Sequence, residues 1–223
     1  MAMKDLGKAF SFMFDDPSWV MKVIIAALFM LLSLLGIGLF VLLGYFVELI
    51  QRVIRREQHP LPEWSDVGVK LVVGFKYFVV ILVYTLPIIL LVVPLIALMG
   101  ISALSEESQA FSAFIAIYTF GYMLLMVPYI LFFTLLTPII TYRFALRERI
   151  GDGLDVGGIL VDFRRNWQNT LVVALISVGL ESFASIGILG FFVGIFFTLF
   201  YAYVVVGHTY GTLYLSTQEG TVA

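Results

Sequence analysis

The sequence predicts an all-α, polytopic integral membrane protein, and three observations carry that prediction. Of its 223 residues, 61% are hydrophobic and only 13% are charged, whereas a soluble domain carries about a quarter charged residues. The apolar residues are gathered into runs long enough to cross a bilayer, which takes about 20 residues as a helix. Prolines and polar turns separate these runs. We expect about six membrane segments, with amphipathic helices lying in the cytoplasmic interface.

The composition also argues against several classes of function. The net charge is −2, which provides no field to attract nucleic acid, so we expect no nucleic-acid partner. The chain has no cysteine, and its two histidines, His59 and His208, are too far apart in sequence to indicate a metal site. It contains no P-loop, nucleophile elbow or HExxH motif. We therefore expect a protein that is not an enzyme and that uses no cofactor or metal.

Residues 1–16 predict a helix that lies in the membrane interface. Leu6, Phe10, Met13 and Phe14 share one face at helical spacing, and an apolar face opposite charged side chains is typical of an interfacial helix. The alternative is a frayed tail.

Residues 20–50 form one apolar run that is too long for a single ordinary span. As a straight helix they would measure about 46 Å, against roughly 30 Å of hydrocarbon. Gly36 and Gly38 interrupt the run near its middle. We expect a short hairpin that turns there and returns to the same side.

The basic residues favour that hairpin over a single crossing. With the hairpin, all thirteen lysines and arginines lie on one side of the membrane, and Glu106, Glu107 and Glu181 lie on the other. We therefore predict six segments in the cytoplasmic membrane with both termini in the cytoplasm. Five spans with the N-terminus outside remain the alternative.

The rest of the chain predicts four further spans. Residues 67–99 and 111–144 are apolar and hold two prolines each, which predict kinks, and residues 101–110 form a polar loop between them. A second interfacial helix covers residues 152–165. Residues 167–215 are long enough for two spans with a turn near Glu181 to Gly187, and residues 216–223 form a tail that we expect to be disordered.

The polar stretch after the hairpin is an exit from the membrane, a turn and a re-entry. Arg52 continues the preceding helix out of the lipid, and Pro62 is one of two prolines that stop it. Trp64 suits the headgroup zone, with its ring nitrogen in water. Ser65 or Asp66 is placed to cap the next helix.

This stretch also resembles a known family. Residues 44–76, GYFVELIQRVIRREQHPLPEWSDVGVKLVVGFK, are similar to the signature of an uncharacterised integral membrane family of bacteria and archaea, domain-of-unknown-function family 4013. The specific part is Gly44 and Tyr45, the exit bearing Arg52, and the turn Leu61-Pro62-Glu63-Trp64 before Asp66. The resemblance implies a prokaryotic multi-pass protein and supplies no activity to carry over.

Ionisable residues inside lipid are costly, so three in or beside apolar runs are candidate functional residues. Glu48 can reach Arg52 one turn later, which predicts a surface ion pair. Glu181 is either a loop residue at the outer surface or a buried polar anchor. His208 is more consistent with a cap or a hydrogen bond near the inner interface than with a proton relay.

These observations lead to two hypotheses about function. The first is a non-enzymatic scaffold or accessory subunit that binds membrane lipids, another membrane protein or a second copy of itself. The second is a carrier or pore for a small or lipid-like substrate, since proline-bent helices can surround a cavity.

Overall fold

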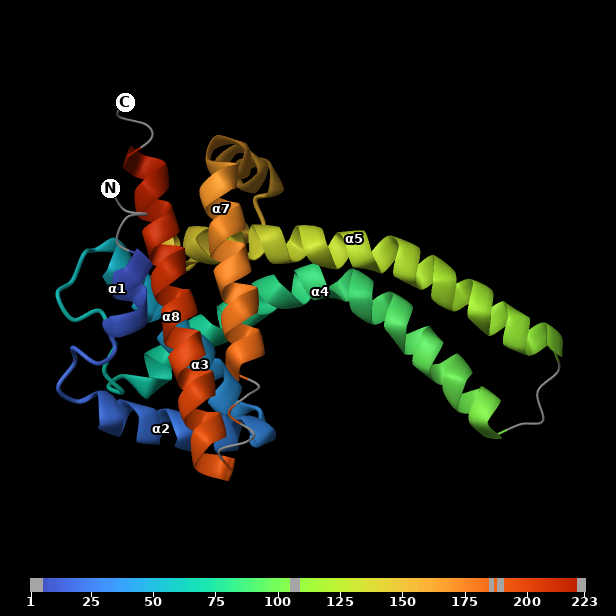
Figure 1. Cartoon of the computed structure of the whole chain (residues 1–223), viewed down its shortest axis with the longest axis horizontal. Coiled ribbons are helices and arrows are strands. Elements are labelled where there is room, and N and C mark those ends of the chain that lie inside the picture. The colour runs from blue at the N-terminus through green and yellow to red at the C-terminus, as the bar shows by residue number, and fades with distance from the viewer. Residues whose placement is uncertain (1–5, 105–108, 185–186, 188–190, 220–223) are drawn as a thin grey trace. The chain divides into compact units, whose positions relative to one another are not determined.

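The computed structural model describes residues 6–104, 109–184, 187 and 191–219. In this part of the chain the regular structure is helical and contains no strand, which confirms the all-α prediction. The elements shown in Figure 1 are α1 (Leu6–Ser11), α2 (Trp19–Leu32), the 3₁₀ turn η2 (Ser33–Leu35), α3 (Ile37–Ile54), α4 (Val67–Leu104), α5 (Gln109–Arg147), α6 (Ile150–Gly153), α7 (Val156–Ala184) and α8 (Phe191–Glu219). They form two compact units, one of residues 1–80 and 135–223 and one of residues 81–134.

Three of the described helices are long and apolar enough to cross a membrane. They are Ile37–Ile54, Val67–Ser102 and Gln109–Arg147, and a shorter apolar helical stretch covers Trp19–Leu35. These helices support a membrane protein. The predicted number of six segments stays a prediction.

The predicted break in the first apolar run is present. The chain turns at Gly36, whose φ of 84° is a conformation that glycine adopts readily and other residues avoid. Helices α2 and α3 pack against each other on either side of the turn. At its tip Leu34 and Leu35 are 88% and 75% exposed. That this hairpin turns inside the bilayer stays a prediction.

Two glycines allow α3 and the start of α4 to cross at backbone contact. A Cβ atom on Gly44 would collide with the backbone of Lys70, and one on Gly74 would collide with the carbonyl oxygen of Phe40. Small residues at a helix crossing let the backbones approach in this way. The glycine of the Gly44-Tyr45 pair is therefore required by packing.

The core of the larger unit lies around α8. This helix contacts α7, α3, α2 and α1, and Figure 1 shows α7 beside it. Buried side chains from the N-terminal segment, α3 and α8 meet there, including Met13, Tyr45, Leu49 and Phe200.

The N-terminal segment differs from the predicted interfacial helix. Helix α1 ends at Ser11, and residues 12–18 continue as turns. Met13 is buried in the core while Phe10 and Phe14 are exposed. The Tyr201 hydroxyl donates a hydrogen bond of 3.0 Å to the carbonyl oxygen of Phe10. Part of the apolar face that we predicted to contact lipid therefore packs against α8 instead. Residues 1–5 lie outside the described residues.

Two segments that we predicted to be irregular are helical in their described residues. The loop expected at residues 101–110 is helical up to Leu104 and again from Gln109, while residues 105–108 lie outside the described residues. The tail expected from Ser216 continues α8 to Glu219, and residues 220–223 are likewise not described. Asn166 donates a hydrogen bond of 2.8 Å to the Ser216 hydroxyl, which fastens the end of α8 to α7.

Helix α7 is kinked at the boundary predicted between the second surface helix and the following span. Asn166 interrupts α7 with φ −137° and ψ 34°, which divides it into two helical stretches. The first begins after Asp155, whose carboxylate accepts a hydrogen bond of 3.1 Å from the backbone N–H of Gly158, as a helix cap does. That the first stretch lies in the interface and the second crosses the membrane stays a prediction.

The smaller unit is a helical hairpin in which tyrosine hydroxyls donate hydrogen bonds to backbone carbonyl oxygens near prolines. Proline lacks an N–H and distorts the turn before it, so nearby carbonyl oxygens need other partners in lipid. The Tyr129 hydroxyl donates to the carbonyl of Tyr84 at 2.5 Å, and that of Tyr118 donates to Leu91 at 3.0 Å. Both acceptors lie three residues before a proline, Pro87 or Pro94.

We expect Gly44→Ala to lower the free energy of unfolding by about 1–3 kcal/mol, because the added methyl group must push α3 away from α4. Gly68→Ala is the matched control, since a Cβ atom at Gly68 meets no atom within 4 Å. Unfolding by SDS in mixed micelles, followed by circular dichroism, measures both. Equal stability of the two variants would contradict the close crossing.

Candidate functional site

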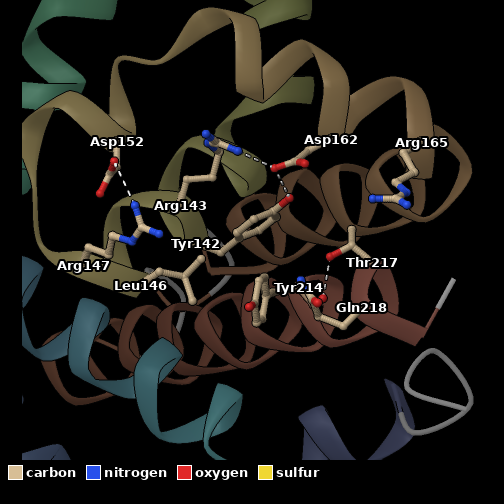
Figure 2. A pocket seen from close by; sticks show the side chains of 10 residues that line it. All are labelled: Tyr142, Arg143, Leu146, Arg147, Asp152, Asp162, Arg165, Tyr214, Thr217 and Gln218. Carbon is tan, nitrogen blue, oxygen red and sulfur yellow. Dashed lines mark hydrogen bonds and ion pairs between the residues drawn. The ribbon is translucent and has the colours of Figure 1, made fainter. Parts of the chain in front are cut away.

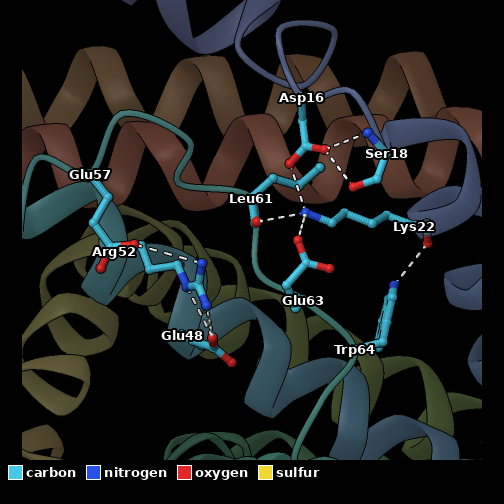
Figure 3. Close-up of polar contacts among 9 residues, drawn as sticks. All are labelled: Asp16, Ser18, Lys22, Glu48, Arg52, Glu57, Leu61, Glu63 and Trp64. Carbon is cyan, nitrogen blue, oxygen red and sulfur yellow. Dashed lines mark hydrogen bonds and ion pairs between the residues drawn. The ribbon is translucent and has the colours of Figure 1, made fainter.

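The most buried charged group in the larger unit is the ammonium of Lys22 on α2, shown in Figure 3. Its side chain is 2% exposed, and its Nζ lies 2.7 Å from Oδ2 of Asp16 and 2.6 Å from Oε1 of Glu63. It also donates a hydrogen bond of 3.0 Å to the carbonyl oxygen of Leu61. One lysine thus fastens the turn before α2 to the turn between α3 and α4.

Asp16 is held as an ionised partner. Its Oδ1 accepts hydrogen bonds from the backbone N–H of Ser18 at 2.8 Å and from the Ser18 hydroxyl at 2.7 Å. Burial by itself would raise the pKa of the Asp16 carboxyl, but the hydrogen bonds from Lys22 and Ser18 outweigh it and lower that pKa. The pair therefore stabilises the fold at neutral pH, and this contribution is lost as pH falls through the lowered pKa.

Trp64 covers this cluster. Its indole N–H donates to the carbonyl oxygen of Lys22 at 3.1 Å, and its ring stacks between Phe29 and Tyr45 at centroid distances of 5.1 and 4.2 Å. The expectation that the ring nitrogen sits in water is therefore wrong. Pro62 is buried in the same turn. The motif residues Tyr45, Pro62 and Trp64 therefore lie at the cluster around Lys22, and we call this cluster with its covering residues the joint.

Glu48 and Arg52 form the ion pair that their spacing predicted, at 2.8 Å. Glu48 also pairs with Lys70 on α4 at 2.7 Å, and Lys70 donates to the carbonyl oxygen of Ser65. Asp66 has a φ of 52° and its carbonyl accepts the first hydrogen bonds of α4. A pocket of about 310 Å³ lies here, and Gly44, Glu48, Arg52, Asp66 and Lys70 are among its lining residues.

A third network joins the end of α5 to the start of α7 (Figure 2). Arg143 pairs with Asp155 at 2.6 Å and with Asp162 at 2.7 Å. The Tyr142 hydroxyl donates to the same Asp162 oxygen at 3.1 Å. A pocket of about 240 Å³ opens beside this network.

The other two candidate residues lie apart from these networks. His208 is buried in α8, with its ring 4.7 Å from that of Phe12 and its Nδ1 3.4 Å from the Thr212 hydroxyl oxygen. Its packing and polar contact are those of a structural residue. Glu181 is exposed on α7 rather than placed in a loop.

Sequence reasoning missed the partners of the first and third networks. Lys22 is the one lysine inside the first apolar run, and an acidic residue six positions earlier was the available signal. The second partner, Glu63, is distant in sequence, as is Asp162 from Arg143, and no local pattern marks such pairs.

We expect Lys22→Met to lower the free energy of unfolding by about 3–5 kcal/mol, because Asp16 would keep a buried charge without its partner. Lys8→Met is the matched control, because Lys8 is exposed, and its expected effect is within about 0.5 kcal/mol. SDS titration in mixed micelles measures both variants. A stable Lys22→Met protein would show that the joint is not needed.

The comparisons with known proteins agree with the motif. No curated protein and no solved structure matches the chain. A family model described as "Protein of unknown function (DUF4013)" matches residues 27–199, a range that includes the joint residues Tyr45, Pro62 and Trp64. The match covers well over half of the chain, and the chain therefore belongs to the DUF4013 family.

Proposed function

We propose that this protein is a non-enzymatic membrane scaffold or accessory subunit that binds lipid or another membrane protein. The proposal rests on two observations: charged side chains form ion pairs between structural elements, and large apolar side chains are exposed. Several buried and half-buried charges of the larger unit form ion pairs that join separate elements, around Lys22, Glu48 and Arg143. Such pairs hold elements in place, and a reaction would need groups that are free to exchange protons.

Apolar surface supports the binding part of the proposal. In the smaller unit, large apolar side chains are exposed on both helices, including Leu90, Ile96, Ile117, Phe120 and Leu124. In the larger unit, an apolar groove of about 410 Å³ lies between α2 and α8, and its lining includes Trp19, Val23 and Phe197. Surfaces of this kind take lipid chains or the apolar face of a membrane partner.

The proposed orientation places both chain ends and all thirteen basic residues in the cytoplasm. It is supported by the turn at Gly36, which allows α2 and α3 to enter and leave on one side. With 14 residues, α2 is about 21 Å long at 1.5 Å per residue, shorter than the roughly 30 Å of hydrocarbon.

The orientation is tested by labelling single cysteines on intact cells, because the chain has no cysteine of its own. We expect a membrane-impermeant maleimide to label Ser105→Cys and not Ala2→Cys. Both variants should react after the cells are opened, which serves as the control. Labelling of Ala2→Cys on intact cells would indicate five spans with the N-terminus outside.

The scaffold role is tested by crosslinking from the exposed apolar surface. We expect Phe120→Cys carrying a photoreactive maleimide to give, in native membranes, one abundant adduct with a different membrane protein. Leu213→Cys is the matched control, because Leu213 is fully buried. Adducts only between copies of this chain, with selective solute flux in liposomes, would favour the carrier or pore instead.

A further inference from the structure

We propose that the pocket beside Arg143 binds a phosphate group carried by an anionic lipid headgroup. We call it the arginine pocket. Its lining comprises Tyr142, Arg143, Leu146, Arg147, Asp152, Asp162, Arg165, Tyr214, Thr217 and Gln218. The inference rests on the proposed function, because it names the class of lipid and the place where it binds.

The arginine pocket is assembled from four elements of the larger unit. The C-terminal part of α5 supplies Arg143 and Arg147, and α6 supplies Asp152. The first part of α7 supplies Asp162 and Arg165, and the end of α8 supplies Tyr214. Figure 2 shows Arg147 and Arg165 on opposite sides of Tyr142 and Tyr214. The pocket thus places two cationic groups around hydroxyl groups, which is the arrangement a phosphate requires.

Two of its guanidinium groups are available for an anion. Among the described residues, none forms a hydrogen bond or an ion pair with Arg165. Arg147 is 69% exposed, and its ion pair with Asp152 is long, at 4.0 Å. Arginine binds phosphate with two parallel N–H donors, so it suits this role better than lysine.

The carboxylates of the pocket leave Arg165 without an ion pair among the described residues. Asp162 accepts from Arg143 and Tyr142, and Asp152 lies 4.0 Å from Arg147. Arg143 therefore acts as the frame of the pocket. Its guanidinium is held between Asp155 and Asp162, which leaves Arg147 and Arg165 as the groups that face an incoming anion.

The depth of the pocket indicates a lipid as the source of the phosphate. Helix α5 is long and apolar enough to cross a membrane, and Arg147 is its last residue. Lipid phosphates lie where such a helix leaves the hydrocarbon, and basic pockets between helices at the cytoplasmic face are suited to anionic headgroups. The volume of about 240 Å³ accommodates a headgroup phosphate with several waters.

The test compares two double variants that remove the same charge. Arg147→Gln with Arg165→Gln changes the pocket, while Arg149→Gln with Arg164→Gln changes two exposed arginines of the same polar interval that do not line it. Binding of dioleoylphosphatidylglycerol, dioleoylphosphatidylcholine and inorganic phosphate is measured on the full chain in neutral detergent.

We expect the protein to bind phosphatidylglycerol more tightly than phosphatidylcholine, and the pocket variant to lose this affinity by about tenfold or more. The control variant should lose less than about threefold. If the pocket variant does not fold, Arg165→Lys keeps the charge but removes the planar fork, and should still weaken binding severalfold.

Three results would overturn the proposal. Equal losses in both double variants would show general attraction to the membrane surface, and equal affinity for the two lipids would show that no anion is recognised. Binding of inorganic phosphate as tightly as phosphatidylglycerol would assign the pocket to a free anion. In each case a partner crosslinked from Phe120→Cys would leave the proposed scaffold role standing.

Discussion

The buried ammonium of Lys22 is the interaction on which the larger unit depends. A charge removed from water is tolerated only when oppositely charged and polar groups surround it, and here they come from both sides of α2. Asp16 precedes the helix, while Leu61 and Glu63 belong to the turn before α4. Trp64 closes the joint over Tyr45, and Tyr45 lies in the core against Phe200. The helices of this unit are thus organised around a buried polar centre.

Within the apolar helices, close backbone packing and hydrogen bonds to backbone carbonyl oxygens hold neighbouring helices together. At the crossing of α3 and α4, Gly44 and Gly74 remove side chains so that backbones can touch. In the smaller unit, the hydroxyls of Tyr118 and Tyr129 donate to carbonyl oxygens that lie three residues before prolines. The tyrosine hydrogen bonds meet the requirement that polar backbone groups find partners without water. Replacing Gly44 by Ala would disturb the close crossing, and replacing Tyr129 by Phe would remove the hydroxyl donor.

Features set by local chemistry were predictable from the sequence. The turn at Gly36 and the break at residue 166 follow from glycines and from a polar interruption between apolar runs. The Glu48–Arg52 pair follows from helical spacing. The pairing of Lys22 with Glu63 and that of Arg143 with Asp162 were not predictable, because these residues meet only once the chain has folded. The tail predicted from Ser216 is helical as far as Glu219, and the hydrogen bond between Ser216 and Asn166 is likewise a tertiary contact that no local pattern indicates.

The partners of Lys22 are synthesised at different times, which affects when the joint can form. Leu61 follows Lys22 by 39 residues, which a ribosome adds in about 2–8 s at 5–20 residues per second. Until then, Asp16 is the one partner of Lys22 in the joint that has been synthesised, because Leu61 and Glu63 come later in the chain. The contacts around Lys22 are therefore completed only after the second polar turn has been made.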